Sequence, residues 1–271
     1  MAVAVMQRMA SGTGMDTDTI MTTDASLSLL RLLQLVSPSL PVGAFAYSQG
    51  LEWAVEAGWV CDQPTLEDWL SDQLAQSLTW VDLPLLLRML DAASRGDMAA
   101  MAAWIDELIA LRETAELRAE EANRGRALAE LLDGLGLLDT FNAGGATRMQ
   151  PAPPTSLGPS SPSPAPDWKS LLSRSQLAGF ALAATVWEID QSDVLAGYAW
   201  SWAENLTLAG IKLVPLGQTA GQRILTRLAG RIPAAVEQAR DLPDTEIGAS
   251  MPALAIASSL HETQYTRLYR S

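Results

Sequence analysis

Apolar residues recur along this chain at the three- and four-residue spacing of amphipathic helices, whereas the alternating pattern of strands is scarce. Near the start, Leu27, Leu30 and Leu33 follow this spacing, with Asp24 or Ser26 as the N-cap. Further helices are predicted over 47–58, 65–78, 82–94, 97–111, 114–132, 168–189, 193–214, 219–230, 233–241 and 253–260. We therefore predict an all-α fold, a multi-helix bundle of about ten helices in a single domain.

Prolines and hydroxyl residues mark where some of these helices begin and end. Pro38 and Pro41 end the first helix, because a residue that precedes proline avoids helical backbone angles. Thr65, with Asp68 three residues later, resembles a capping box and predicts the start of the third helix.

Two stretches lack the composition of a helical core. Residues 1–24 hold small residues and many threonines, and we interpret them as a disordered leader. Residues 140–166 hold seven of the fifteen prolines and one charged residue, Arg148. We interpret them as a flexible Pro/Ser-rich surface insertion within one helical domain over 25–271, since a long surface loop costs little extra closure entropy.

The overall charge excludes one class of partner. The chain carries a net charge of −13, with 48% hydrophobic and 18% charged residues. Binding to nucleic acid or to an anionic membrane surface depends on clustered Lys and Arg, so neither is expected. A basic protein surface is a compatible partner.

Metal ligands and membrane spans are also scarce. Cys61 is the only cysteine, which indicates a reducing compartment and a cytoplasmic protein, and His261 is the only histidine. A nickel or zinc site built from His and Cys within one protomer is therefore not expected, and we predict that the protein alone binds nickel weakly or not at all. A symmetric dimer that brings two His261 side chains together, giving a shared two-His site, is the alternative. The longest apolar run, Leu177 to Trp187, is too short to cross a bilayer.

No motif for enzymatic chemistry emerges from the sequence. It contains no phosphate-binding loop of the Gly-x-x-x-x-Gly-Lys-[Ser/Thr] type, so nucleotide binding by that device is excluded. Glu120 and Glu121 lie near Arg118 and Arg124, which is typical of solvated ion pairs on a helix surface. We expect neither catalytic residues nor a cofactor.

Three segments carry the candidate binding residues. The first, residues 37–52, places Tyr47, Gln49 and Glu52 after a turn fixed by prolines and a glycine. The second, residues 200–222, contains Lys212, whose only fellow lysine is Lys169, together with Gln218 and Gln222.

The third segment, residues 261–271, crowds large contact residues into a short stretch. Tyr and Arg offer contact area together with directed hydrogen bonds, which is typical of partner hot spots. The candidates are Gln264, Tyr265, Arg267, Leu268, Tyr269 and Arg270. Two interpretations remain open: a partner-binding tail, or a terminal segment docked on the core of its own chain.

Four sequence blocks, taken in order, resemble the UreF family of urease accessory proteins. They are Leu33-Gln34-Leu35-Val36-Ser37-Pro38 continuing to Tyr47-Ser48-Gln49-Gly50-Leu51-Glu52, then Leu111 to Arg118, then Lys212-Leu213-Val214-Pro215-Leu216-Gly217-Gln218, then His261 to Ser271. Together they cover most of the chain from about residue 26 onward. Ala44 and Ala46 depart from the family's Gly-Gly-Phe-Ser-Tyr pattern, and Ala46 lacks the hydroxyl of that serine.

The resemblance implies a non-enzymatic, all-α adaptor that forms a homodimer. UreF-like proteins bind the accessory protein UreD, also called UreH. This pair recruits the GTPase UreG, and the assembly delivers nickel to apo-urease. Two alternatives stand beside this expectation: a helical enzyme acting on an apolar small molecule, for which no Asp-Asp-x-x-Asp or Glu-x-x-His pattern is present, and a generic helical scaffold.

Overall fold

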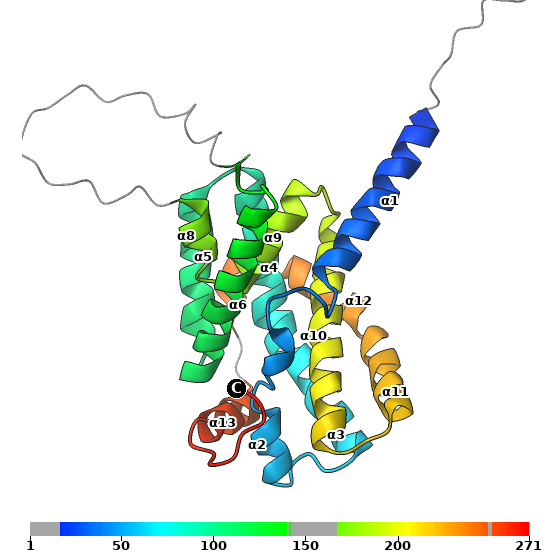
Figure 1. Ribbon diagram of the computed structural model, residues 1–271, viewed down its shortest axis with the longest axis vertical. Helices are drawn as coiled ribbons and strands as arrows, with labels where there is room; N and C mark the ends of the chain where they lie inside the picture. Colours follow the sequence, from blue (N-terminus) through cyan, green and yellow to red (C-terminus); the bar gives the residue numbers. More distant parts are fainter. Residues whose placement is uncertain (1–16, 140, 142–166, 249–250, 271) are drawn as a thin grey trace, which may run out of the picture.

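The computed structural model describes residues 17–139, 141, 167–248 and 251–270. In these ranges the chain forms helices and no strand, which confirms the all-α prediction (Figure 1). The helices are α1 (Thr17–Leu35), α2 (Leu51–Glu56), α3 (Gln63–Gln73), α4 (Leu83–Ser94), α5 (Met98–Leu111), α6 (Ala115–Gly134), α8 (Trp168–Leu172), α9 (Gln176–Val186), α10 (Gln191–Leu213), α11 (Gln218–Ala229), α12 (Ile232–Asp241) and α13 (Pro252–His261). Two short 3₁₀ turns are η1 (Ala44–Ala46) and η3 (Asp244–Glu246).

The core lies around α4 and α9, which pack against each other, with α6 against α9 and α5 against α4. Every residue of α9 from Gln176 to Ala184 is buried, and Phe180 at its centre is 1% exposed. Burying a side chain of this size stabilises the fold by about 1.5–3 kcal/mol. The long helix α10 packs against α4, α11 and α12.

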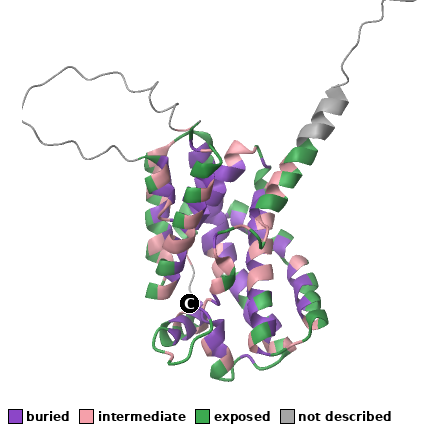
Figure 2. Cartoon of the chain, in the orientation of Figure 1, coloured by how far each residue is buried: buried purple, intermediate pink, exposed green. Residues whose placement is uncertain are grey.

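Helix α1 differs from the others because it projects from the body (Figures 1 and 2). Its leucines Leu27, Leu29, Leu30 and Leu33 are each more than half exposed, while Leu35 at its end is buried. The helix begins at Thr17 rather than at Asp24 or Ser26, so it overlaps the end of the predicted leader. Residues 1–16 of that leader and the predicted insertion, apart from Phe141, lie outside the described residues.

Side-chain caps explain why several helices begin where they do. The carboxylates of Asp62, Asp97 and Asp167 each accept an amide hydrogen bond from the first turn of the helix that follows. The hydroxyls of Thr114 and Ser175 cap α6 and α9 in the same way.

Besides the start of α1, four predicted boundaries are wrong. The capping box of α3 pairs Asp62 with Thr65, not Thr65 with Asp68. The predicted helix over 168–189 is broken between α8 and α9 where Ser175 starts a new helix. Helix α2 begins at Leu51 rather than near Tyr47, because Gln49 and Gly50 adopt positive φ angles of 52° and 78°.

The fourth difference joins two predicted helices into one path. Between α3 and α4 the chain widens into a π-helix, η2 (Leu74–Asp82), so the helical course from Gln63 to Ser94 is uninterrupted. The hydroxyl of Thr79 donates to the carbonyl of Leu74 at 2.7 Å inside this segment. Along this course α3 packs against α11, η2 against α12, and α4 against α9.

Candidate functional site

The candidate site is the last part of the described chain, residues 262–270, which we call the tail. It follows α13, and α13 packs against α2 and α6. The contact with α2 is close: a Cβ atom on Gly50 would lie 2.8 Å from the amide nitrogen of Ser258. The contact with α6 is polar, since the hydroxyls of Thr114 and Ser258 lie 2.8 Å apart.

Glu262, the first tail residue, extends the contact with α6. Its Oε1 accepts the amide hydrogens of Ala115 at 3.0 Å and Glu116 at 3.4 Å. These amides belong to the first turn of α6, where a carboxylate is favoured by the helix dipole. The tail is thereby anchored at its beginning.

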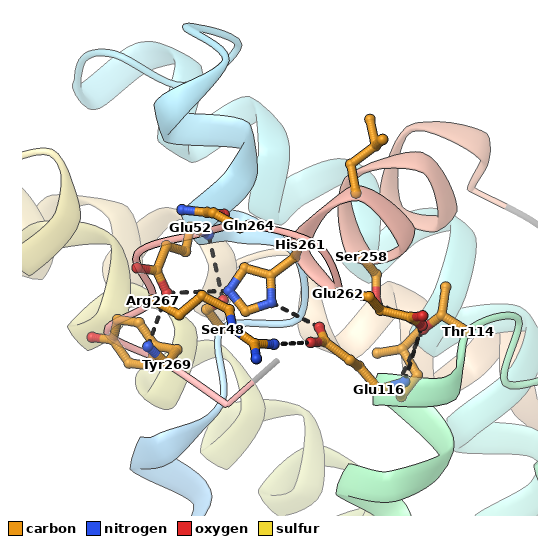
Figure 3. A network of polar contacts seen from close by, with 12 residues as sticks. Ser48, Glu52, Thr114, Glu116, Ser258, His261, Glu262, Gln264, Arg267 and Tyr269 are labelled. Carbon is orange, nitrogen blue, oxygen red and sulfur yellow. Dashed lines mark hydrogen bonds and ion pairs between the residues drawn. The ribbon is translucent and has the colours of Figure 1, made fainter.

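Glu52, on α2, holds the other end of the tail through its backbone. Its Oε1 accepts the amide hydrogen of Leu268 at 2.6 Å, and its Oε2 accepts that of Tyr269 at 2.8 Å (Figure 3). The amide of Arg270 donates to the carbonyl of Ala46 at 2.8 Å. The Tyr269 side chain is 7% exposed, and burial together with Glu52 raises the pKa of its phenol.

His261 lies between these two anchors and is fully buried. Its Nε2 is 3.2 Å from Oε2 of Glu52, and its Nδ1 is 2.7 Å from Oε2 of Glu116 (Figure 3). The other oxygen of Glu116, Oε1, pairs with Arg267 of the tail at 2.8 Å. One cluster of Glu52, Glu116, His261 and Arg267 therefore ties α2, α6, α13 and the tail together.

The docked tail leaves other side chains in solvent. Tyr265 is fully exposed, Leu268 is 70% exposed, and the side chain of Arg270 is also exposed. We call these three residues the tail surface. An open groove of about 640 Å³ lies between the start of α6 and α13, and its lining includes Glu113, Arg118, Ile256, Leu260 and Glu262.

The candidate residues in and around the tail thus separate into an exposed group, the tail surface, and a group whose side chains are buried or half-buried. Tyr47, Glu52 and Tyr269 are buried within the chain. A direct partner contact by these three side chains stays a prediction. Two further candidates, Gln49 and Gln264, are half-buried and bonded within the chain.

The contacts of these two glutamines are specific. Gln49 accepts a hydrogen bond from Nε1 of Trp202 at 3.1 Å and donates to Glu120 at 3.1 Å. Gln264 donates to the carbonyl of Thr266 at 3.1 Å and also to Glu56. Gln49 thus links side chains of α10 and α6, and Gln264 links the tail to the side chain of Glu56 on α2.

Lys212, Gln218 and Gln222 lie elsewhere, around the junction of α10 and α11. All three are exposed, with Lys212 in the last turn of α10 and Gln218 at the start of α11. Lys212 forms no ion pair with any side chain in the described ranges. The structure does not bring these residues into the tail cluster.

A second buried charge cluster consists of Arg112, Asp82 and Glu121. Nη2 of Arg112 lies 2.6 Å from Asp82 and 3.0 Å from Glu121. Glu121 also accepts hydrogen bonds from the hydroxyl of Ser175 at 2.8 Å and the amide of Leu177 at 3.1 Å. Burial alone would raise the pKa of Glu121, but Arg112 and these donors outweigh it and lower that pKa.

The expectation of solvated ion pairs at Glu120 and Glu121 is therefore wrong. Glu120 does pair with Arg124 one turn later, at 2.6 Å, but both glutamates are buried. Periodicity could not show this, because α6 buries these positions against α9 and the turn before α2.

Glu116 and Glu262 were not among the candidates, although they hold the tail. Glu116 belongs to the block from Leu111 to Arg118 and Glu262 to the block from His261 to Ser271, and membership of these blocks was the available signal. Its partners His261 and Arg267 lie 145 and 151 positions further along the chain, so no local pattern pairs them.

Metal sites and membrane spans are other features that the described residues could contain. In the described ranges no group of three or more His, Cys, Asp or Glu side chains is placed to hold a metal ion. None of the helices in the same ranges has the length and apolar character needed to cross a membrane.

Comparisons with known proteins agree with the sequence blocks. A family model described as UreF matches residues 60–229. The chain is 45% identical over 244 residues to the urease accessory protein UreF of Alcanivorax borkumensis, covering 90% of this chain and 98% of that protein. It is 46% identical over 248 residues to the protein of the same name from Pseudomonas putida strain W619, covering 92% and 100%. A Klebsiella pneumoniae protein of that name is 44% identical over 242 residues, covering 89% and 97%. The chain belongs to the UreF family of urease accessory proteins.

Proposed function

We propose that this chain is a non-enzymatic adaptor of urease maturation. Together with UreD (UreH), it recruits the GTPase UreG to apo-urease for nickel insertion, and it does so in the cytoplasm as a homodimer. Its relatives are named accessory proteins, which supports a role outside catalysis. The lone cysteine and the strongly acidic composition are compatible with this role.

We further propose that the tail surface is a contact site for UreD or UreG. The observation that carries this proposal is the contrast between a fixed backbone and exposed side chains. Glu52 and the carbonyl of Ala46 hold the backbone of Leu268, Tyr269 and Arg270 in place. A segment ordered before binding loses less entropy when a partner arrives, and Tyr and Arg are frequent hot spots.

Pull-down assays with UreD, UreG and apo-urease test the proposal. Deleting residues 263–271 should leave the helical content of the chain nearly unchanged and abolish recruitment of UreG, UreD or both. A Tyr265→Ala, Leu268→Ala double variant should weaken recruitment while leaving the backbone anchors of the tail in place, because both side chains point to solvent. Assembly of the full complex by the truncated chain at wild-type affinity would show that the tail is not a binding element.

A further inference from the structure

The outer face of α11 carries positive charge without negative charge. Residues 205–236 contain no Asp or Glu, although the whole chain has a net charge of −13. The cations of this stretch are Lys212, Arg223, Arg227 and Arg231. Arg223 and Arg227 lie one turn apart on α11, and Arg231 lies directly before α12. These three arginines are exposed, and we call them the arginine stripe.

The inner face of α11 fixes the direction in which the stripe points. Ile224, Leu225 and Leu228 are buried there, where α11 packs against α10 and α3 (Figures 1 and 2). The packing on α10 is close, since a Cβ atom on Gly221 would lie 3.1 Å from the side chain of Ile211. The opposite face of the helix, with its arginines, is therefore held toward solvent.

The spacing of the stripe is unfavourable for the helix itself. Elsewhere the chain places a carboxylate one turn before an exposed arginine, as Asp91 lies before Arg95. On α11 the corresponding pair is Arg223 and Arg227, two like charges four residues apart, which destabilise a helix. The stability of α11 therefore does not explain this arrangement of charges.

The chain neutralises only part of the stripe. Arg227 pairs with Glu67 of α3, whose side chain is 10% exposed. Within the described residues, neither Arg223 nor Arg231 forms an ion pair. The other outward residues of α11 are uncharged and polar, and they are Gln218, Thr219, Gln222 and Thr226. The face thus offers guanidinium groups and hydrogen bonds, with no large apolar side chain to bury.

This chemistry fits a cluster of carboxylates on another folded protein. A guanidinium group donates two parallel hydrogen bonds to a carboxylate, which favours arginine in polar protein contacts. Nucleic acid or an anionic membrane extends over a wide area, so it would also meet the acidic remainder of this chain and be repelled. A compact acidic patch would meet the stripe alone.

We propose that the arginine stripe is a second contact surface of the adaptor, and that it docks a carboxylate-rich patch of a partner protein in urease maturation. This inference rests on the proposed function, because an adaptor that joins two proteins needs two separate surfaces. The stripe is separate from the tail, since α13 packs against α2, α2 against α10, and α10 against α11 (Figure 1). A polar surface of this kind acts mainly on the rate of encounter and on specificity.

Biolayer interferometry with the full chain tests the inference, with purified UreD, UreG and apo-urease offered separately and then together. An Arg223→Glu, Arg231→Glu double variant should associate with at least one of these proteins about tenfold more slowly, while dissociation changes less. Salt screens charges at a surface, so the difference between wild type and variant should shrink as salt rises from about 0.05 M to about 0.5 M. An Arg223→Gln, Arg231→Gln variant should give an intermediate rate.

Two controls separate docking from folding and from total charge. A glutamate at position 223 lies four residues before Arg227 and replaces a like-charge pair by a favourable one, so α11 should stay folded, as circular dichroism and thermal melting will show. The matched variant Arg95→Glu, Arg126→Glu makes the same change of net charge at exposed positions at the end of α4 and on α6. It should keep the wild-type association rate.

Three results would overturn the inference. They are a stripe variant that associates at the wild-type rate and with the wild-type salt dependence, an equal slowing by the matched variant, and a stripe that affects only self-association or binding to duplex DNA or phosphatidylserine vesicles. In each case a wild-type chain that still binds its maturation partners leaves the proposed function standing. A wild-type chain that binds none of UreD, UreG and apo-urease would refute the proposed function, and the inference with it.

Discussion

The amide of Tyr269 donates a 2.8 Å hydrogen bond to Oε2 of Glu52, a residue that lies 217 positions earlier in the chain. This bond and its neighbour at Leu268 mean that a side chain of α2 fixes the backbone of the tail. Glu52 is therefore a positioning residue. It determines where Tyr265, Leu268 and Arg270 lie without being exposed itself.

Glu52→Ala is expected to release the tail. Hydrogen bonds to a charged group contribute about 1.5–3 kcal/mol, so protection of the Leu268 and Tyr269 amides from hydrogen exchange should fall by at least tenfold. Circular dichroism should show nearly unchanged helical content. Glu56→Ala is the matched control, because Glu56 lies on the same helix and contacts the side chain of Gln264 rather than these amides. Unchanged protection in the Glu52 variant would refute the anchoring role.

Gly125→Ala is expected to destabilise the packing of α6 on α9. A Cβ atom at this position would lie 2.7 Å from the amide nitrogen and 2.8 Å from the carbonyl carbon of Ser175, and neither backbone atom can move away easily. Overpacking of this kind costs about 1–3 kcal/mol in the free energy of unfolding. Urea denaturation measures it.

Gly134→Ala provides the control on the same helix. In the described part of the chain, no atom apart from its neighbours and its own helix backbone lies within 4 Å of the added Cβ. Alanine also favours the helix by up to about 1 kcal/mol over glycine. The two variants should therefore change stability in opposite directions. Equal effects would mean that the contact with Ser175 is not tight.

Glu121→Gln is expected to reduce stability at neutral pH by about 2 kcal/mol, because it removes a charged acceptor from Arg112, Ser175 and Leu177. The pKa of Glu121 is lowered by folding, so its contribution is present above its ordinary value of 4.5 and is lost as the pH falls below it. The stability gap between wild type and variant should therefore narrow from pH 7 toward pH 3. A gap that widens on acidification would contradict the assigned direction.

Lys212→Ala is expected to leave the melting temperature nearly unchanged, since the side chain is exposed and a charge at a helix end contributes only a fraction of a kcal/mol. If Lys212 contacts a partner, urease activation in nickel-limited cells should fall sharply. Lys169→Ala, which removes a lysine paired with Glu130 and Asp133, controls for the loss of charge and should keep activation. A large loss of thermal stability with activation preserved would assign Lys212 a structural role.

The helical class was predictable from the sequence because it depends on short-range spacing of apolar residues. The boundaries of the helices were less predictable, and the break before Ser175 shows why. Residues 173–176 are polar, and Ser175 caps α9 by a local bond from the amide of Ala178, so the sequence held part of the signal. The hydroxyl of Ser175 also bonds to Glu121 on another helix, and no local window contains that contact.

The residues of the candidate site were likewise predictable only in part. Tyr265, Leu268 and Arg270 were identifiable by residue type and are exposed as expected. The buried anchors were not, because a glutamate that caps a distant backbone has the same sequence pattern as one in solvent. His261 was noted only as a missing metal ligand, and its position between two carboxylates required the fold.

The π-helix η2 fixes the rotational phase of α3 relative to α4. Each residue of an α-helix turns the chain by about 100°, so removing one residue from Leu74–Asp82 would rotate α3 by that angle while α4 stayed on α9. Leu66 of α3 would then leave Gly210 of α10, where a Cβ atom would already lie 2.5 Å from its side chain. The length of this segment is therefore as constrained as its composition, and a one-residue deletion there should be far more damaging than a substitution.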